Sequence, residues 1–318
     1  EAIIRMQVTD DPQKCTFWMA ARHNYAHYMK YVEMDEPMPM AFAIGLHPVY
    51  EIMSNWSGKH EGFDELEFAA GILGEDVEMV KCETIDLEVP AEAEIVLEGE
   101  ILANHTEAEG PFGEVPGTYA GKRTAEVFRL KTITRRRSPV FYALHCGAPV
   151  TCAQATTALC IEIGTWEHMK TVEGGLDLLD VRCIPAAGTM LVVVKLRPTV
   201  EGQAKTALMA ALSGPFLHPK LAIAVDDDID AADLRQVMWS MTTRVHAQRD
   251  VVMIPNVRVF PLDNASPEIA GGTGFERVGT KWMIDATKPA LTQTKERARF
   301  ERAMPLNFDS VNIEDFLT

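Results

Sequence analysis

The sequence of 318 residues has few basic side chains, with 30 lysines and arginines against 46 acidic residues and a formal net charge of −16. Proteins bind nucleic acids and anionic membranes through clustered cations, so this balance argues against either partner. The one basic run, Arg135–Arg137, is short and follows an alternating pattern, which favours a solvated strand end. No apolar stretch reaches the roughly 18 residues of a membrane span, and no secretory signal is recognisable.

The chain also lacks paired cysteines, because its six cysteines are scattered without any C-x-x-C spacing. Neither a disulfide framework nor a zinc ribbon is indicated. We therefore expect reduced, mostly buried thiols in a cytoplasmic protein. The sequence contains no internal repeat and no G-x-G-x-x-G after a strand, so a pyridine-nucleotide site is not indicated either. The cysteines are Cys15, Cys82, Cys146, Cys152, Cys160 and Cys183.

The most informative segment that is present is Glu-Gly-Pro-Phe-Gly-Glu at residues 109–114. Pro111 fixes its own φ and has no N–H, while Gly110 and Gly113 allow backbone angles that other residues avoid. Such a turn holds Glu109 and Glu114 at a set separation. A charged surface loop is the plainer interpretation of an isolated E-G-x-x-G-E.

Two further motifs leave alternatives open. Arg5 lies in an apolar strand start, Ala2–Met6, where it either pairs with a buried anion or reaches solvent from an edge strand. His23 and His27 have the i,i+4 spacing of a helical pair, which a metal could bind or which could merely pack or cap. The metalloprotease Glu after the first His is absent, so a zinc protease is disfavoured.

The acidic run Asp226–Asp230 invites comparison with a calcium loop, but it lacks the Gly and the terminal Glu of an EF-hand. It stands between an expected strand, 220–225, and an expected helix, 231–245. Carboxylates near a helix N-terminus explain it adequately.

Together, the E-G-P-F-G-E turn, the preceding segments 80–91 and 94–101, and the Arg-Met-Gln-Val strand start resemble the UbiD family of reversible decarboxylases, which use prenylated FMN. The resemblance implies a catalytic network of Arg5, Glu109 and Glu114, with Glu114 as proton donor and Glu109 holding Arg5. Two neighbouring carboxyls raise each other's pKa while an arginine limits the rise, which suits a group that must deliver a proton.

The same resemblance implies the remaining parts of a cofactor site. His23 and Glu65 would bind Mn²⁺ or Mg²⁺, Lys220 would reach the flavin phosphate, and a K⁺ ion would bind near 54–57. A third metal ligand of the family, an Asn five residues before the catalytic Arg, would fall before Glu1, so we expect that an N-terminal segment is missing from this chain. The cofactor-binding set expected in full is Ile3, Ile4, Arg5, Arg22, His23, Glu65 and Lys220.

Substrate discrimination is expected at Met19, Arg22 and Val115. Arg22 stands where ferulic-acid-type decarboxylases have Gln, which favours a more polar aromatic acid or an additional phosphate contact. The implied substrate is an aromatic or α,β-unsaturated carboxylic acid, and the implied partner is a UbiX-type flavin prenyltransferase that supplies the cofactor.

The expected fold class is α+β: a split β-barrel-like flavin-binding core over 1–140, an α/β oligomerisation domain over 141–290, and a tail over 291–318 with an amphipathic C-terminal helix. A homo-oligomer, dimer or hexamer, is expected. The periodicity predicts strands at 2–9, 40–46, 94–101, 125–133, 188–196 and 220–225, and helices at 24–32, 64–73, 156–169, 203–212 and 231–245. Residues 15–21 form a further apolar run.

Two other functions are compatible with parts of this pattern. The core could bind unmodified FMN in an oxidoreductase, which the absence of a pyridine-nucleotide motif disfavours. The acidic run and the negative charge could instead belong to a non-enzymatic, cation-binding assembly protein.

Overall fold

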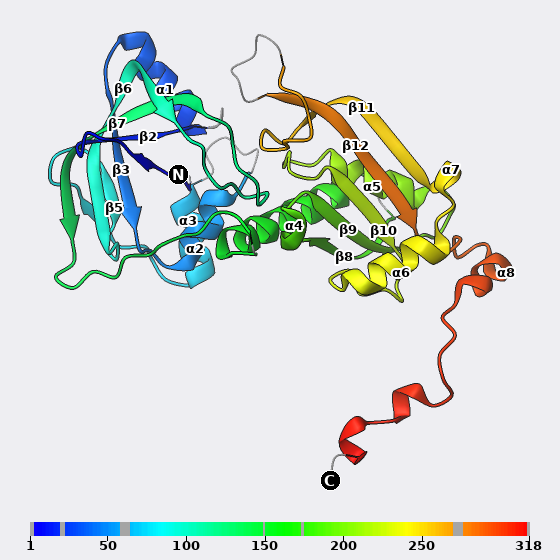
Figure 1. Cartoon of the computed structure of the whole chain (residues 1–318). Helices are drawn as coiled ribbons and strands as arrows, with labels where there is room; N and C mark the ends of the chain where they lie inside the picture. The colour runs from blue at the N-terminus through cyan, green and yellow to red at the C-terminus, as the bar shows by residue number, and fades with distance from the viewer. Residues whose placement is uncertain are drawn as a thin grey trace.

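A computed structural model of the chain describes residues 3–19, 23–57, 64–148, 150–172, 175–269 and 276–316; of His23, Asp309 and Ile313 it describes the backbone alone. The described residues form two lobes joined by one long helix, and the C-terminal segment leaves the second lobe as an extended arm (Figure 1). The mixed α+β class expected from the sequence is confirmed.

The N-terminal lobe is built on an antiparallel five-stranded sheet in the order β1-β2-β7-β6-β3. The expected split barrel is not closed in the part that the structure describes, because β1 and β3 are the two edges of this sheet. Helix α1 (His23–Met34) packs on it through Tyr28, in a core with Phe17 and Phe128. The strands are β1 (Gln7–Val8), β2 (Lys14–Phe17), β3 (Met38–Ile44), β6 (Ile95–Glu109) and β7 (Arg123–Arg135).

Two short helices lie beneath this sheet, α2 (Pro48–Asn55) and α3 (Glu65–Leu73) (Figure 1). Asp64 accepts hydrogen bonds from the first turn of α3, and Gly74 ends the helix in the left-handed conformation. The N-terminal strand segment is tied to α2, since Ile3 N–H donates to the Ser54 carbonyl at 3.5 Å. The small sheet of β4 (Met79–Lys81) and β5 (Glu88–Pro90) precedes the long β6–β7 hairpin.

The C-terminal lobe has a mixed sheet in the order β11-β12-β10-β9-β8, with its three central strands parallel. Strands β9 and β10 are rich in Val, Ile, Leu and Ala because both of their faces are covered. Helices α4 (Cys152–Val172) and α5 (Gln203–Leu212) cover one face, and α6 (Leu234–Arg244) covers the other. The strands are β8 (Asp177–Cys183), β9 (Leu191–Arg197), β10 (Leu221–Val225), β11 (Val251–Val259) and β12 (Arg277–Ala286).

Several predicted elements are wrong in extent. Of the described part of the strand predicted over 2–9, only Gln7–Val8 is paired, and the apolar run that begins at residue 15 overlaps a strand at Lys14–Phe17. The helix predicted from residue 231 begins at Leu234, because Asp233 is its N-cap and accepts from Arg235 N–H. The acidic run 226–230 therefore does not cap this helix. Helix α2, β8, β11 and β12 were not predicted.

The predicted amphipathic C-terminal helix is also wrong. After β12 the chain forms only short turns: α8 (Thr294–Arg297), η2 (Ala298–Phe300), η3 (Phe308–Ser310) and η4 (Ile313–Phe316). Pro305 cannot continue a helix, and Asn307 has a left-handed φ of 60° that interrupts one.

Among the described helices none combines the length and the apolar character that a membrane crossing needs. The six cysteines are free, but only Cys160 and Cys183 are buried, so the expectation of mostly buried thiols is wrong; Cys152 is exposed.

Candidate active site

The structure brings Arg5 to the two acids of the E-G-P-F-G-E turn. Arg5 donates to Glu114 Oε1 from Nη2 at 2.5 Å and from Nε at 3.1 Å. Its Nη1 lies 3.7 Å from Glu109 Oε1, which is an ion-pair distance but not a hydrogen bond. Arg5 therefore binds Glu114 more closely than Glu109. The family resemblance had implied that Glu109 is the acid that holds Arg5.

A second arginine, which sequence reasoning missed, completes this group. Arg123 donates from Nε to Glu109 Oε2 at 2.7 Å and from Nη2 to Glu114 Oε1 at 3.1 Å. It opens β7 directly opposite Glu109, the last residue of β6. Each arginine also lies over an aromatic ring, Arg5 over Phe112 at 4.5 Å and Arg123 over Trp18 at 5.0 Å. The rings keep the planar guanidinium groups flat against the acids.

The turn between the acids leaves little freedom to move. Gly110 has a φ of +91°, and its N–H donates to the Gln7 side chain at 2.8 Å. A Cβ at Gly110 would lie 2.9 Å from the Gly121 carbonyl oxygen, and a Cβ at Gly113 would lie 2.8 Å from the Cys146 carbonyl oxygen. Close backbone contacts therefore require glycine at both positions, and at Gly110 the positive φ requires it as well.

Burial dominates the electrostatics of the two acids. Glu109 is 1% exposed and Glu114 is 5% exposed. Burial raises the pKa of Glu109, and the charges of Glu114 and Glu126 raise it further, while Arg5 lowers it. Burial likewise raises the pKa of Glu114, against the hydrogen bond and charge of Arg5. Both carboxyls thus hold a proton more readily than a carboxyl in water does.

One buried acceptor in this group has no protein donor. Glu109 Oε1 has no hydrogen-bond partner within the described residues. An orphaned buried acceptor costs free energy unless a ligand or a proton satisfies it. The residues present therefore fit a bound group that offers a hydrogen-bond donor beside Arg5.

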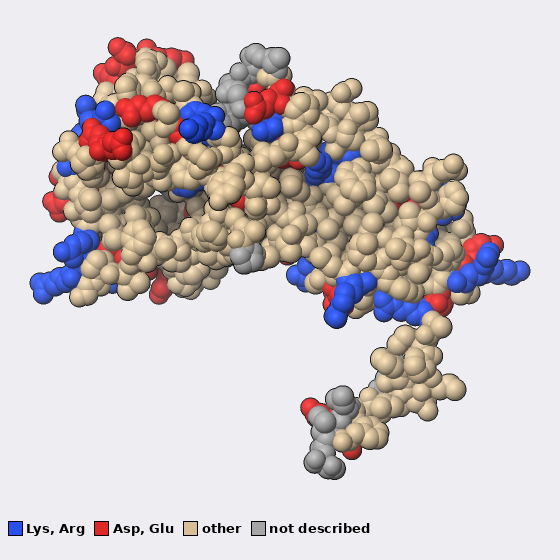
Figure 2. Space-filling view, viewed as in Figure 1, with Lys and Arg blue, Asp and Glu red and all other residues tan. Residues whose placement is uncertain are grey.

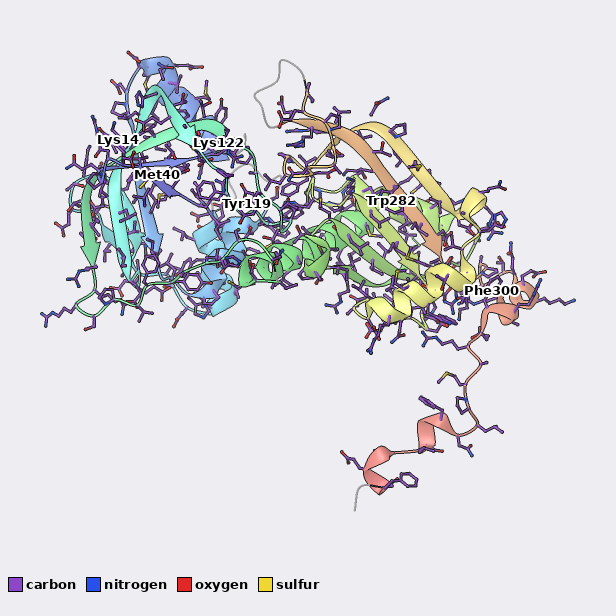
Figure 3. The ribbon with its side chains drawn as sticks, in the orientation of Figure 1. Lys14, Met40, Tyr119, Lys122, Trp282 and Phe300 are labelled. Atoms are coloured by element: carbon purple, nitrogen blue, oxygen red, sulfur yellow. The ribbon has the colours of Figure 1, made fainter. Side chains whose placement is uncertain are left out.

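The backbone that follows Glu114 is held by the other lobe. Gln154 of α4 donates to the Val115 carbonyl at 2.8 Å, and Asn264 donates to Thr118 Oγ1 and to the Tyr119 carbonyl at 3.1 and 3.0 Å. Figure 3 shows Tyr119 on the side of the first lobe that faces the second. Glu114 therefore lies where the two lobes meet.

The expected metal and cofactor contacts stay predictions. Arg22 and the His23 side chain lie outside the described residues, so their positions are not available for comparison with Glu65, which is buried at the start of α3. Met19 is buried, Val115 is half-buried, and Ile3 and Ile4 are partly exposed. Lys220 binds Asp263 at 2.8 Å, so any phosphate contact would compete with that ion pair.

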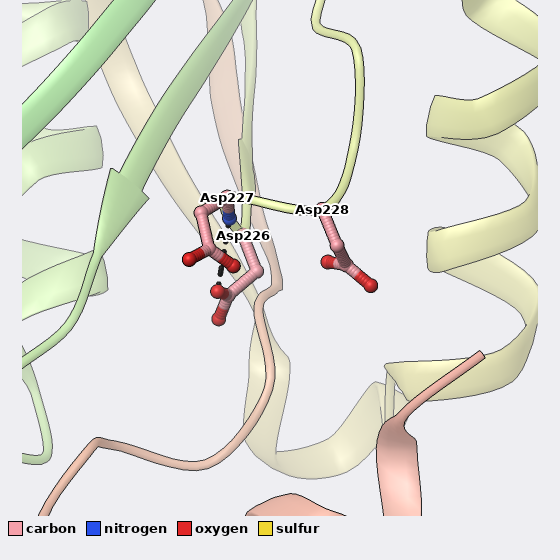
Figure 4. Close-up of side chains that lie close together, drawn as sticks. All are labelled: Asp226, Asp227 and Asp228. Atoms are coloured by element: carbon pink, nitrogen blue, oxygen red, sulfur yellow. Dashed lines mark hydrogen bonds between the residues drawn. The ribbon is translucent and has the colours of Figure 1, made fainter. Parts of the chain in front are cut away.

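The acidic run 226–228 is a neutralised cluster rather than a vacant cation site. The three carboxylates lie close together at the end of β10 (Figure 4). Arg297 holds Asp226 in a bidentate pair at 3.0 and 2.5 Å, Arg244 holds Asp228, and Arg197 holds Asp227. Lys288 Nζ lies within 3.9 Å of all three carboxylates. Each of the three carboxylates is thus already paired with at least one cation, which disfavours a metal ion here.

Charged side chains are scattered over the face in Figure 2, without a continuous basic stripe on that face. The described residues thus provide one chemically distinctive group, the two acids and two arginines between β1, β6 and β7.

Family models, curated relatives and solved structures all match this chain to the same family. Residues 2–149 match the family model of the 3-octaprenyl-4-hydroxybenzoate carboxy-lyase Rift-related domain, UbiD, and residues 156–286 match that of the corresponding C-terminal domain, UbiD_C. A phenolic acid decarboxylase of Bacillus subtilis (strain 168) is 31% identical over 296 residues, which is 92% of this chain and 60% of the relative. The chain thus spans about 60% of the length of this curated relative.

Two solved structures are similar over 99% of this chain. The UbiD-class enzyme HmfF from Pelotomaculum thermopropionicum, in complex with FMN, has a TM-score of 0.86 and 31% identity, and the match covers 67% of that chain. An evolved dimeric form of the same enzyme, in complex with prFMN, has a TM-score of 0.82 and 29% identity, and the match covers 66% of that chain.

Proposed function

The chain belongs to the UbiD family, and from that premise we propose that it carries the acid–base site of a flavin-dependent carboxy-lyase. The reaction is the non-oxidative, reversible decarboxylation of an aromatic or α,β-unsaturated carboxylic acid. The observation that carries this proposal is the buried group of Arg5, Glu109, Glu114 and Arg123, in which two carboxyls with raised pKa values lie beside two fixed cations.

The cofactor we propose is prenylated FMN, because a similar UbiD-class structure is a complex with prFMN. The orphaned Glu109 Oε1 beside Arg5 fits a ligand with a hydrogen-bond donor at this place. A bound prenylated flavin would supply an electron sink for the pair that remains on carbon when CO₂ leaves. The protein's contribution is to orient the acid and to supply a proton.

In the decarboxylation direction, the C–C bond to the carboxylate breaks, CO₂ leaves, and a proton replaces it on carbon. Glu114 donates that proton and recovers one from solvent before the next turnover. Arg5 holds the substrate's carboxylate through its planar fork, and Arg123 orients Glu109. In the carboxylation direction, Glu114 removes the proton from the carbon that attacks CO₂.

The remaining assignments rest on the family resemblance. We propose that His23 and Glu65 hold Mn²⁺ or Mg²⁺ near the flavin phosphate, that K⁺ binds near 54–57, and that Ile3, Ile4, Arg22 and Lys220 contact the flavin. Replacing His23 or Glu65 by Ala should lower the flavin retained on purification, and the double variant should be little worse than either, because each loss breaks one shared site. If both single variants retained as much manganese and as much flavin as the unaltered chain, this site would be excluded.

We further propose a cytoplasmic homo-oligomer, a dimer or hexamer, supplied with cofactor by a UbiX-type prenyltransferase. The direct test of the function is to produce the chain together with such a prenyltransferase, and to identify the bound flavin by native mass spectrometry. The loaded protein is then incubated with a panel of aromatic and cinnamic-type acids. Liquid chromatography follows the consumption of each acid and the formation of its decarboxylated product. Oxidation of NADH without any decarboxylation would show an oxidoreductase instead.

A further inference from the structure

The two acids and two arginines form a group whose charges balance when both acids are ionised. Arg5 and Arg123 both donate to Glu114 Oε1, and Arg123 also donates to Glu109 at 2.7 Å. Water is largely excluded, since the Glu109 side chain is 0% exposed and the Glu114 side chain 7%. A charge that is not balanced inside such a group is expensive.

A carboxylate ligand beside Arg5 would break this balance by adding one negative charge. The arginines cannot change their charge, because guanidinium remains protonated in proteins. Glu109 keeps its short bond to Arg123 at 2.7 Å. Glu114 would lose the most, because two of the three hydrogen bonds to its Oε1 come from Arg5. No described residue donates to its Oε2, which is therefore the oxygen able to carry a proton.

We propose that binding of the substrate's carboxylate draws one proton from solvent onto Glu114, while Arg123 keeps Glu109 ionised. The inference rests on the proposed function, because it assumes that the ligand is an aromatic carboxylate held by Arg5. Substrate binding then loads the proton that decarboxylation consumes. Arg123 acts as a positioning residue, since it touches the acids and not the reacting atoms.

Other titratable groups face these acids and serve as controls. Glu126 of β7 accepts from Met19 N–H at 3.3 Å and contributes negative charge to Glu109, and burial raises its pKa as well. Cys146 in the segment after β7 adjoins Glu114, and burial raises the pKa of its thiol, which stays neutral near pH 7. Glu126 is thus an alternative proton acceptor outside the pair of Glu109 and Glu114.

The test uses the full chain loaded with unmodified FMN, so that ligands bind without reacting. Benzoate, 4-hydroxybenzoate and 3,4-dihydroxybenzoate are titrated calorimetrically at pH 7.5 in phosphate and in Tris, whose ionisation enthalpies differ. The buffer dependence of the heat gives the protons taken up per ligand. We expect about one proton for each carboxylate, since one charge must be balanced, and none for benzamide.

Variants identify the acceptor. Glu114→Gln should bind benzoate without proton uptake and with an affinity independent of pH, while Glu126→Gln should behave as the unaltered chain. Arg123→Gln should weaken binding by about tenfold or more, because the remaining cation faces two acids and the ligand. Arg123→Lys should restore most of that affinity. Arg129→Gln is the matched control on the same strand, where Arg129 pairs with Glu100 instead, and should change neither quantity.

Two failures are distinguishable. If none of the three acids binds, the inference fails, and the proposed function fails with it when the loaded chain also decarboxylates no acid of the aromatic and cinnamic panel. If an acid binds without proton uptake, or if uptake persists in Glu114→Gln, the inference alone is overturned.

Discussion

Among single residues, Glu114 has the most specific expected role, because it is the acid with the most hydrogen bonds from the two arginines. Glu114→Gln keeps the shape but cannot donate a proton. We expect decarboxylation to fall by about 10²–10⁴-fold while flavin binding is retained, as for the loss of a general acid. Turnover is measured by CO₂ release and flavin content by absorbance.

The matched control is Glu107→Gln, which changes an acid two residues before Glu109 on the same strand. Glu107 pairs with Lys14 and His105 outside the group of two acids and two arginines, so its variant should turn over normally. Near-normal activity of Glu114→Gln would remove Glu114 from the mechanism.

The raised pKa of Glu114 also predicts a dependence of stability on pH. An acid whose pKa is higher in the folded than in the unfolded protein binds more protons when folded, so it destabilises the fold as pH rises through the interval between the two values. Burial raises this pKa above its usual value of 4.5. We therefore compare the unfolding free energy of Glu114→Gln with that of the unaltered chain. The value for the variant minus the value for the unaltered chain should increase with pH once the pH exceeds about 4.5, by at most about 1.4 kcal/mol per pH unit.

Urea unfolding at a series of pH values measures this difference. Glu107 is a control with a pKa shift in the opposite direction, because its hydrogen bond from His105 lowers its pKa. The corresponding difference in unfolding free energy for Glu107→Gln should therefore not increase with pH. A flat difference for Glu114→Gln between pH 4.5 and 8 would show that the burial of Glu114 does not raise its pKa.

At the scale of elements, the turn after Glu114 depends on a glycine from the other lobe. Gly188 follows η1 (Pro185–Ala187) with a φ of +65°, and a Cβ there would lie 2.8 Å from the Pro116 carbonyl oxygen. Gly188→Ala therefore adds a contact clash to the ordinary cost of about 1–2 kcal/mol for a left-handed alanine. We expect lower thermal stability and also lower turnover, because residues 115–117 must shift.

Gly202→Ala separates the two costs. Gly202 also has a positive φ, +91°, but nothing lies within 4 Å of its Cβ position. It should show the conformational cost with unchanged turnover. Equal effects of the two substitutions on turnover would mean that contact between the lobes does not position Glu114.

How far the sequence predicts these elements depends on where their hydrogen bonds are satisfied. Helix α5 and strand β10 match their predicted ranges within a residue, because their own apolar patterns define them. Arg123 was not found, because the β6–β7 ladder shifts register twice before it pairs Glu109 with Arg123. No local pattern encodes such bulges. Helix α2, which follows the strand predicted over 40–46, was not predicted, although His47 caps it and Pro48 begins it.

At the scale of the whole molecule, charge pairing between distant segments decides what the sequence left open. The acidic run 226–228 was compatible with a cation site or with helix capping, and only the fold brings Lys288 and Arg297 to it. The C-terminal arm carries exposed apolar residues, including Leu306 at 95% and Phe316 at 72%, with no long helix to present them. The tail was predicted as a helix from amphipathic spacing alone, which does not account for Pro305 and Asn307.

Asp226 anchors the start of that arm, and its removal should release it. Its side chain is fully buried and accepts from Arg297 and from Lys288 N–H at 3.1 Å. Asp226→Asn leaves Arg297 and Lys288 with too little negative charge, and breaking such a buried pair costs about 3–5 kcal/mol. We expect a lower melting temperature and faster tryptic cleavage after Lys295 and Arg297. Asp177→Asn, in the exposed pair with Arg197, should change neither. Addition of Ca²⁺ should not shift the melting temperature of the unaltered chain, because each of the three carboxylates already has a cation partner. A calcium-dependent rise would restore the cation-site interpretation.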